Sequence, residues 1–393
     1  MVLPTHRGEK RTADTIRSDD HPIEYYLHER YRVPGKKKLM RVYYGLRPFM
    51  PRSVQLALRR VYAKKQAQTE FPRWPIEPLL VERAERELAE RIRQSAEGRV
   101  PLITMWPGNA RAAVALTHDV EWGKGMRNIP RVRALEKRYG VVSSWNFVAE
   151  RYPLDKELFK VLEREGCEIG LHGVYHDGKK FSSRAIFEER LPKINAYLQQ
   201  WGAVGFRSPA THRNPEWMPE IAAEYDSSFP DTDPFEPQAG GCCSIFPFFL
   251  GRMVELPITL VQDHTLIEIL QEKDIRLWIE KASWIIEHHG LVNIIIHPDY
   301  MMTDRNLGYY EEFLRFITRQ ENLWLALPRE IARWWKDRAA SCITTESGAP
   351  KIEGPAKDRG RVVWAVLESG NVHYIADSPL HQHQKSNHES SVR

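Results

Sequence analysis

Four apolar, strand-like runs in this chain each end in a charged or imidazole side chain. The side chains at these ends are Asp119, His172, Arg207 and His297. The carboxyl ends of parallel strands share one rim, where loops can vary while the strands hold functional groups in place. A carboxylate, imidazoles and an arginine at one rim indicate metal-assisted hydrolysis.

From residue 110 onward, apolar β-branched runs alternate with segments of helical periodicity at the spacing of βα units. Strands are expected near 112–117, 142–148, 167–172, 203–206, 253–258, 292–297 and 322–326. Helices are expected near 129–139, 155–166, 184–201, 215–224, 265–289, 309–320 and 328–338. About seven repeats favour a nearly closed barrel over an open doubly wound sheet, which would gather its polar groups at one switch point.

The composition changes on both sides of this barrel region. A proline-rich stretch and a charged helix at 79–97 precede it, and two apolar runs around Glu-Ser-Gly after residue 360 predict a β-hairpin. Four parts are expected: a disordered N-terminus at 1–25, a basic helical extension at 26–108, the barrel at 109–338 and a tail at 339–393. Within the barrel, the irregular, aromatic-rich insertion at 230–252 is expected to form a wall of the substrate cleft.

Composition narrows the class of protein and its compartment. An apolar content of 42% and a charged content of 28% are typical of a soluble globular protein. The first residues lack the apolar core of a signal peptide, so a cytoplasmic location is expected. The four cysteines show no Cys-x-x-Cys spacing, so they are expected to be free thiols.

The segment at 30–65 contains twelve Lys or Arg residues and no Asp or Glu, with aromatic and apolar residues between them. Two interpretations remain open. The segment is either a solvated basic face packed on the main domain, or a peripheral contact with an anionic membrane surface or a phosphate-rich ligand. No nucleic-acid motif accompanies the charge, so no nucleic-acid partner is expected.

Candidate metal ligands lie after two of the strands. His172 and His176 are four residues apart, so both imidazoles can face one divalent cation; a pair of surface histidines is the alternative. Asp119 and Glu121 are two apart at a strand end and therefore point to one side. One carboxylate can bind the metal while the other takes a proton from water; a turn with two solvated acids is the alternative.

Two further strand ends supply an arginine and a histidine. Arg207 can anchor a carboxylate and keep its pKa low. His297, before a proline, is either a core residue or a general acid at the rim. Asp263 and His264 either contact the substrate or form a structural turn.

Taken in order, these segments resemble the polysaccharide deacetylases of the NodB type (carbohydrate esterase family 4) over about 110–335. That family has five ordered motifs: Thr-Phe-Asp-Asp-Gly, His-x-x-x-His, Arg-x-Pro, an Asp-bearing segment, and an apolar strand ending in His. In the first motif this chain has Val120 and Glu121 after Asp119, which is closer to the Asp-x-Asp variant of divergent members. The chain also resembles sugar-modifying members of surface-glycan biosynthesis clusters, in the segments 255–260 and 262–264. The matching positions are 117–121, His172 and His176, Arg207 and Pro209, Asp226, and His297.

The resemblance implies a distorted (β/α)7-type barrel and a role for each matched residue. Glu121, His172 and His176 would bind a divalent metal, Zn²⁺ as first choice, and Asp119 would be the base; the roles of Asp119 and Glu121 could be exchanged. Arg207 would orient the base with Asp226 behind it, and His297 would be the acid. The backbone N–H of Ala210 would stabilise the oxyanion, with Pro209 and Trp122 beside the substrate.

The implied function is metal-dependent removal of an acetyl group from an N-acetylated sugar or glycan precursor, which a lipid or nucleotide could carry. Two alternatives stay open. One is hydrolysis of another non-peptide carbon–nitrogen bond. The other is a glycan-binding barrel that has lost catalysis, which the valine at position 120 favours.

Overall fold

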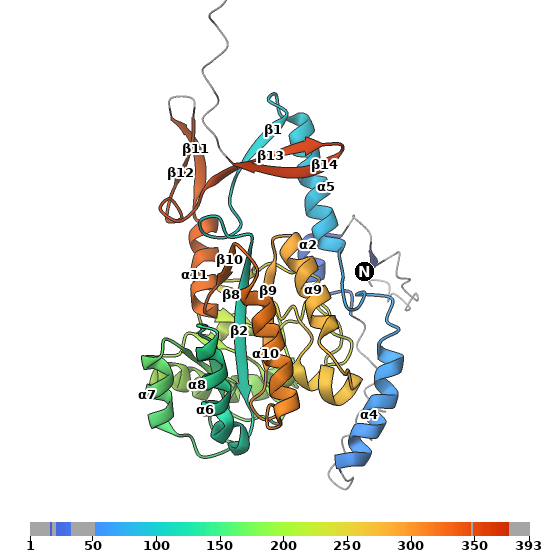
Figure 1. Ribbon diagram of the computed structural model, residues 1–393, viewed down its shortest axis with the longest axis vertical. Coiled ribbons are helices and arrows are strands. Elements are labelled where there is room, and N and C mark those ends of the chain that lie inside the picture. Colours follow the sequence, from blue (N-terminus) through green and yellow to red (C-terminus); the bar gives the residue numbers. More distant parts are fainter. Residues whose placement is uncertain (1–15, 18–20, 33–51, 347–348, 377–393) are drawn as a thin grey trace, which may run out of the picture.

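The computed structural model describes residues 16–17, 21–32, 52–346 and 349–376 (Figure 1). Most of the N-terminus predicted to be disordered, and residues 33–51 of the basic segment, lie outside these ranges. Within them, no helix is both long and apolar enough to cross a membrane. All four cysteines are free, as predicted.

Seven parallel strands form the wall of a barrel, and their order along the wall is β9-β2-β3-β4-β5-β6-β8. Two more strands extend the sheet: β10 lies beside the first half of β2, and β7 pairs antiparallel with β8. The bounds are β2 (Ala112–Val120), β3 (Ser144–Phe147), β4 (Glu168–Leu171), β5 (Gly205–Phe206), β6 (Tyr225–Asp226), β7 (Phe248–Leu250), β8 (Met253–Glu255), β9 (Leu291–Ile296) and β10 (Leu323–Leu325).

The wall closes between β8 and β9 through a loop. The backbone N–H groups of Thr259 and Leu260 donate to the carbonyl of Asn293 on β9. The Asn293 amide in turn donates to the carbonyls of Leu256 and Pro257. The predicted nearly closed barrel is therefore confirmed, and the open doubly wound sheet is excluded.

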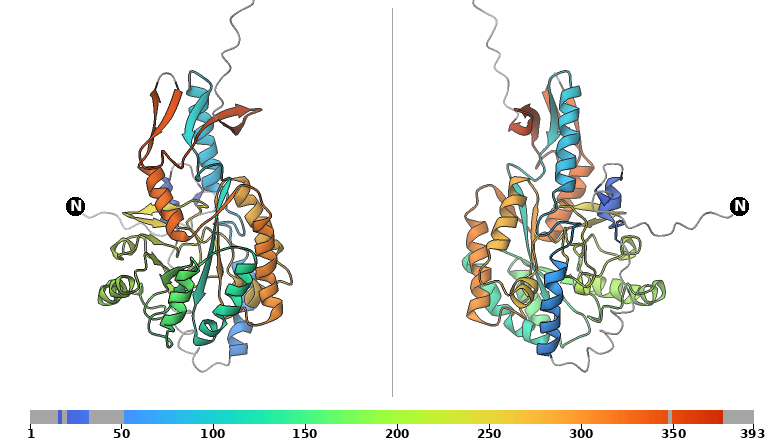
Figure 2. Two further views of the ribbon diagram at one scale, coloured as in Figure 1. Left: turned by 60° about the vertical axis from the view of Figure 1, so that its left-hand side comes forward. Right: turned by 90° about the vertical axis from the view of Figure 1, so that its right-hand side faces the viewer.

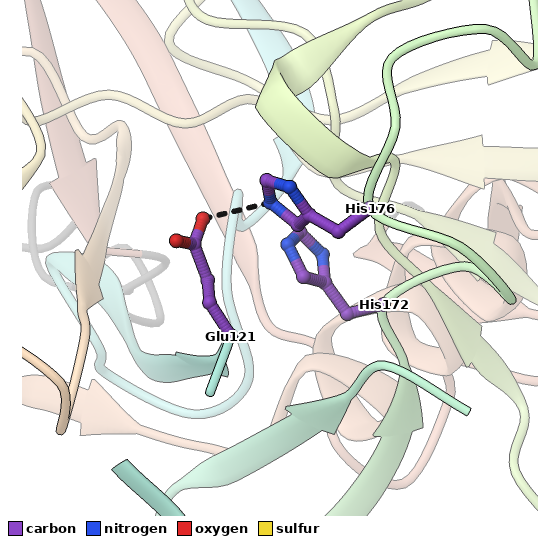
Figure 3. Close-up of side chains that lie close together, drawn as sticks. All are labelled: Glu121, His172 and His176. Atoms are coloured by element: carbon purple, nitrogen blue, oxygen red, sulfur yellow. Dashed lines mark ion pairs between the residues drawn. The ribbon is translucent and has the colours of Figure 1, made fainter. Parts of the chain in front are cut away.

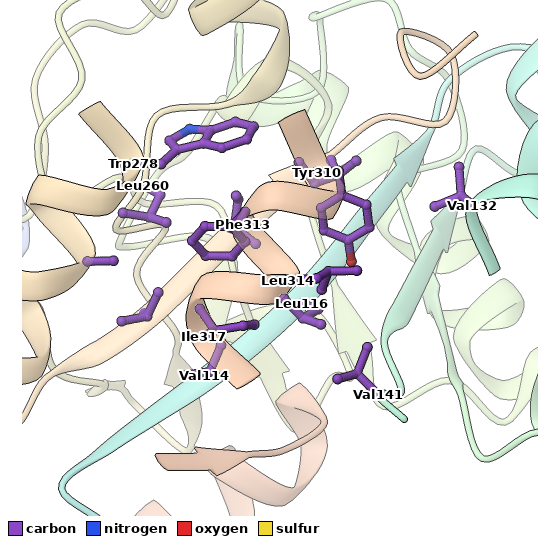
Figure 4. Close-up of a cluster of buried hydrophobic side chains, with 14 of the residues drawn as sticks. Val114, Leu116, Val132, Val141, Leu260, Trp278, Tyr310, Phe313, Leu314 and Ile317 are labelled. Carbon is purple, nitrogen blue, oxygen red and sulfur yellow. The ribbon is translucent and has the colours of Figure 1, made fainter. Parts of the chain in front are cut away.

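Helices cover the outside of the barrel (Figures 1 and 2). They are α6 (Gly123–Arg138), α7 (Lys156–Arg164), α8 (Arg184–Trp201), α9 (Arg276–Glu287), α10 (Asp304–Thr318) and α11 (Pro328–Ala339). The largest core cluster lies between the sheet and α6, α9 and α10, and includes Leu116, Trp278 and Phe313 (Figure 4). All nine residues of β2 are buried, so both faces of this wall strand are covered.

Two helix predictions were wrong. The segment at 215–224 contains only the 3-10 turn η3 (Met218–Glu220), because a proline at 219 interrupts the helical hydrogen bonds. The segment at 265–289 is divided into η4 (Thr265–Leu270) and α9 by Gln271, which has a left-handed backbone. The strands β6 and β7 were not predicted.

A second sheet joins the segment just before the barrel to the tail that follows it. Strand β1 (Arg99–Ile103) pairs with β13 (Val362–Glu368), which pairs with β14 (Asn371–Ala376) and forms the predicted hairpin. A further hairpin joins β11 (Cys342–Glu346) and β12 (Ala349–Glu353). Before the barrel lie α2 (Ile23–Leu27), α4 (Arg52–Gln66) and α5 (Leu79–Gln94).

A buried carboxyl at the start of β4 makes stability depend on pH. Glu168 accepts hydrogen bonds from the Tyr225 hydroxyl (2.9 Å) and the Arg329 N–H (3.2 Å), and burial raises its pKa to about 7. A carboxyl pKa raised on folding contributes stability that is complete below the unfolded pKa, 4.5. That stability is lost as the pH rises through the folded pKa.

We expect Glu168→Gln to flatten this pH dependence, because the amide does not ionise. Between about pH 5 and pH 8 the native protein should lose about 2 kcal/mol more stability than the variant. Urea unfolding at the two pH values measures the difference. The exposed Glu157→Gln serves as control, and equal losses in native protein and Glu168→Gln would contradict the assignment.

Candidate metal centre

The side chains of Glu121, His172 and His176 converge at the carboxyl end of the barrel strands (Figure 3). Glu121 follows β2, and both histidines follow β4. One ligand atom from each residue lies within 4.8 Å of the other two. The Glu121 Oε1 to His176 Nε2 distance is 2.8 Å. The structure thus brings together the three residues that were predicted as ligands.

Local backbone geometry turns the two histidines to one side. Gly173 has a φ of +69°, which a residue with a Cβ rarely adopts. A Cβ there would lie 2.9 Å from Cδ of Pro209. The His172 N–H donates to the carbonyl of Phe147 on β3. The loop between the histidines therefore packs directly on the loop that carries Pro209 and Ala210.

The protonation states of His172 and Glu121 suit a metal. Both ring nitrogens of His172 are buried, and neither has a hydrogen-bond partner among the described residues. Burial lowers the pKa of His172 to about 4, so the imidazole is neutral near pH 7. Burial alone would raise the pKa of Glu121, but the nearby imidazoles, above all His176 with Nε2 at 2.8 Å, hold it well below the usual range. Two imidazoles and one carboxylate match a catalytic zinc set with one open position.

Asp119 lies beside this cluster with one oxygen already engaged. Its Oδ1 accepts from the Asn146 amide at 2.9 Å and is 3.5 Å from Nη1 of Arg207. Its Oδ2 is 3.8 Å from Nδ1 of His172. Burial opposes ionisation, but Arg207 and His172 lower the pKa of Asp119, so the carboxylate is charged and able to accept a proton at Oδ2.

Asn146 was not predicted as a site residue. It lies on β3, and its amide holds Asp119 in place. Gly170 on the neighbouring strand makes room for it, because a Cβ there would lie 2.0 Å from the Asn146 Oδ1. The sequence signal for this close approach is a glycine within the strand Glu168–Leu171.

Arg207 is buried and connects three strands. Its Nη1 donates to the Thr117 hydroxyl at 2.9 Å, and its Nη2 donates to the Ser227 hydroxyl at 2.8 Å. The predicted partner Asp226 is the residue before Ser227, and its carboxylate accepts from Ser228 at 2.9 Å. The direct hydrogen bond from Arg207 to this segment therefore goes to a serine hydroxyl.

Asp226 lies against a second buried carboxyl, Glu255 on β8. The Oε1 of Glu255 accepts from the N–H groups of Ser228 and Phe229. Burial, together with the charge of Asp226, raises the pKa of Glu255 well above its usual value. The Ser208 N–H donates to the Ser228 hydroxyl, so this carboxyl pair supports the loop that leads to Ala210.

His297 lies beside Glu121 of the metal cluster, whereas Asp119 lies beside His172. Its Nε2 is 3.8 Å from Glu121 Oε1, and its Nδ1 is 2.6 Å from Oδ1 of Asp263. The His297 N–H also donates to the Asp263 carboxylate at 2.8 Å. Burial would lower the pKa of His297, but Asp263, Glu121 and Asp119 raise it to about 10. The ring is therefore charged near pH 7, with Nε2 directed at the cluster.

Two of the predicted substrate contacts are surface features of the rim. Ala210 lies in the 3-10 turn η2 (Pro209–Thr211) with a left-handed backbone, φ 53° and ψ 31°. Trp122 is 48% exposed, and the Arg151 guanidinium lies 3.5 Å from its ring centroid.

A pocket beside His176 is lined by Gly173, Val174, Tyr175, Asp177, Gly178, Lys180, Arg190, Ile194, Ser208, Pro209 and His212.

The insertion at 230–252 is mostly buried and contacts the turn η2. Glu236 receives a hydrogen bond from the Thr211 hydroxyl at 3.3 Å and another from the Gln262 amide at 3.0 Å. Phe235, Cys242 and other side chains of the insertion are buried. The insertion thus supports the loops of the rim that carry Thr211 and Gln262.

Comparisons with known proteins gave no match at the level of sequence: no family model and no curated protein matches the chain. Among solved structures, the fold is similar to that of a putative polysaccharide deacetylase from Mycobacterium smegmatis (19% identity, 59% of this chain and 92% of that chain, TM-score 0.46). It is also similar to that of a probable polysaccharide deacetylase from Pseudomonas aeruginosa PAO1 (17% identity, 61% of this chain and 96% of that chain, TM-score 0.49). A third similar structure is an allantoinase (16% identity, 61% of this chain and 95% of that chain, TM-score 0.48).

Two of these three structures are of the class that the ordered motifs resemble. Their identities to this chain are 19% and 17%, and their TM-scores are 0.46 and 0.49. The functional assignment therefore rests on the residues of this chain and their geometry.

Proposed function

We propose that this protein is a metal-dependent hydrolase that removes an acetyl group from an N-acetylated sugar or glycan precursor. One observation carries the proposal: an ionised carboxylate, Asp119, and a protonated imidazole, His297, both lie beside the cluster of Glu121, His172 and His176. Hydrolysis of an amide needs a base for water and an acid for the leaving nitrogen. Asp119 is next to His172 and His297 is next to Glu121, so the two groups reach different ligands of the cluster.

A divalent metal, Zn²⁺ as first choice for two imidazoles and a carboxylate, would supply Lewis-acid activation of water and of the acetamide carbonyl. Asp119 would take the proton of the attacking water at Oδ2, while Asn146 and Arg207 hold Oδ1. This division of the two oxygens fixes the base without occupying the atom that accepts the proton.

The groups around His297 would complete the reaction. His297 would donate its Nε2 proton to the departing amine, and Asp263 holds the ring by Nδ1 so that Nε2 faces the cluster. The Ala210 N–H would donate to the developing oxyanion. Trp122, next to ligand Glu121, would offer an exposed ring against which a sugar can pack.

The alternative of a barrel without catalysis depends on Val120, which occupies the place of the family's second aspartate. Val120 is fully buried, and the next residue, Glu121, turns toward the two histidines. A carboxylate is therefore present where a ligand is needed, which supports catalysis. Hydrolysis of another non-peptide carbon–nitrogen bond would use the same groups, and the choice between the two is a matter of substrate.

Acetate release by the purified protein with added Zn²⁺, Co²⁺ or Mn²⁺ tests the proposal. The panel would include chito-oligosaccharides, a nucleotide-linked N-acetyl sugar and a lipid-linked N-acetyl sugar, with a formamide and a cyclic amide for the other bond types. Acetate release from the sugars is the expected result. Metal binding without hydrolysis of any of these compounds would contradict it and favour a glycan-binding barrel.

We expect Asp119→Asn to keep the bound metal and to lose most of the activity. The amide cannot accept the proton of water, so kcat should fall by roughly 10²- to 10⁴-fold. Metal content by elemental analysis and acetate release measure the two effects separately. Asp304→Asn, at an exposed carboxylate, is the control, and an unchanged kcat in Asp119→Asn would remove this residue from the mechanism.

A further inference from the structure

Helix α4 is attached to the barrel by one face. Ala63 on that face is buried and packs against Phe235 and Ile269. The Arg60 Nε donates to the carbonyl of Glu268 at 2.8 Å, and the Gln66 amide donates to that of Pro234 at 2.6 Å. These contacts hold α4 against the insertion and η4.

The opposite face of α4 is apolar and exposed. Leu58 is 48% exposed, Val61 is 72% exposed and Tyr62 is 54% exposed. Their spacing of three and four residues places them in one stripe along the helix. Large apolar side chains together on one outward helix face indicate a surface that something else covers.

Charge indicates what covers this stripe. The sequence of α4 contains five Lys or Arg residues and no Asp or Glu. Lys64 and Lys65, in its last turn, are exposed. A helix with an apolar stripe and lysines beside it matches a bilayer surface whose lipids are anionic. Two copies of α4 facing each other would instead bring like charges together.

The position of α4 connects this face with the metal centre. Strand β2 points its carboxyl end, which Glu121 follows, toward the lower end of the molecule in Figure 1. Helix α4 lies at that same end in Figure 1 and in both views of Figure 2. A surface contacted by α4 would therefore lie on the side of the barrel where the site opens.

We infer that the stripe of Leu58, Val61 and Tyr62 rests on an anionic membrane surface, with Lys64 and Lys65 at the lipid phosphates. The contact turns the substrate end of the barrel toward the bilayer. Given the proposed deacetylase function, on which this last step rests, the substrate class is an N-acetylated sugar carried on a membrane lipid.

Vesicle flotation of the full-length protein tests the contact. The probes are vesicles of phosphatidylcholine alone and vesicles with about 30% phosphatidylglycerol. We expect binding to the anionic vesicles only, and a loss of about tenfold or more in Val61→Glu/Tyr62→Glu and in Lys64→Gln/Lys65→Gln. The control is Phe249→Glu, at an exposed apolar residue of β7, which should bind like the native protein.

Three results would overturn the inference. These are no flotation of the native protein on anionic vesicles, equal flotation of the Val61→Glu/Tyr62→Glu variant, and a native dimer that this variant dissociates without any vesicle binding. Acetate release from a water-soluble N-acetyl sugar keeps the two proposals apart. The variant should retain that activity, so its loss of vesicle binding is independent of catalysis.

Discussion

His172→Ala should abolish acetate release and remove the bound metal while the barrel remains folded. This residue contributes a neutral imidazole whose two nitrogens are buried and without a partner among the described residues. Its removal leaves only Glu121 and His176, and two ligands hold a catalytic metal poorly. We expect metal affinity to fall by roughly a hundredfold or more, since even a residue that only supports a ligand costs about 10- to 100-fold.

Metal content after reconstitution, acetate release and thermal unfolding measure this effect together. The matched control is His288→Ala, at a surface histidine after α9 whose contact is with Glu85. It should leave all three readouts unchanged. A His172→Ala protein that still holds one metal ion and still releases acetate at the native rate would exclude the proposed centre.

Asp263→Asn should retain the metal and lower kcat by about 10²- to 10³-fold. The Asp263 carboxylate accepts hydrogen bonds from Nδ1 of His297 and from the backbone N–H of the same residue. An amide can satisfy only one of these donors, and it lacks the charge that stabilises the imidazolium. The ring is then held less firmly, and the pKa of His297 falls.

The pH profile separates this role from a purely structural one. A general acid with a lower pKa loses its proton at lower pH, so the alkaline limb of the kcat profile should move to lower pH in Asp263→Asn. His297→Ala should remove that limb, and the double variant should be no slower than His297→Ala alone, because the two residues act as one unit. A profile equal to the native one would contradict the assignment.

The apolar runs of the sequence placed candidate residues at strand ends, and the structure brings Glu121, His172 and His176 together. The spacing of His172 and His176 made them candidate ligands, and the choice of Glu121 over Asp119 came from the resemblance to the deacetylases. Asn146 and Asp263 could not be assigned in the same way. Their roles depend on contacts with Asp119 and His297, which are 27 and 34 residues away in the chain.

The strands of the fold, like the residues of the site, could be predicted only in part. The long buried runs that became β2 and β9 were predicted, whereas β6 has two residues and no recognisable pattern. The closure of the barrel between β8 and β9 depends on hydrogen bonds from an irregular loop to Asn293. Such a loop has no period, so only the assembled barrel shows that it completes the wall.

The sequence by itself determined the chemistry available to this protein: two imidazoles, two carboxylates, an arginine and a histidine, each at the end of a parallel strand. Only the tertiary structure decided that Glu121 joins the two histidines while Asp119 stands beside them with Oδ1 engaged. It also decided that Asp263 holds His297, and that α4 lies at the end where the site opens. The physical reason is that residue type sets which protons and ligands a side chain offers, whereas packing between distant segments sets where each one points.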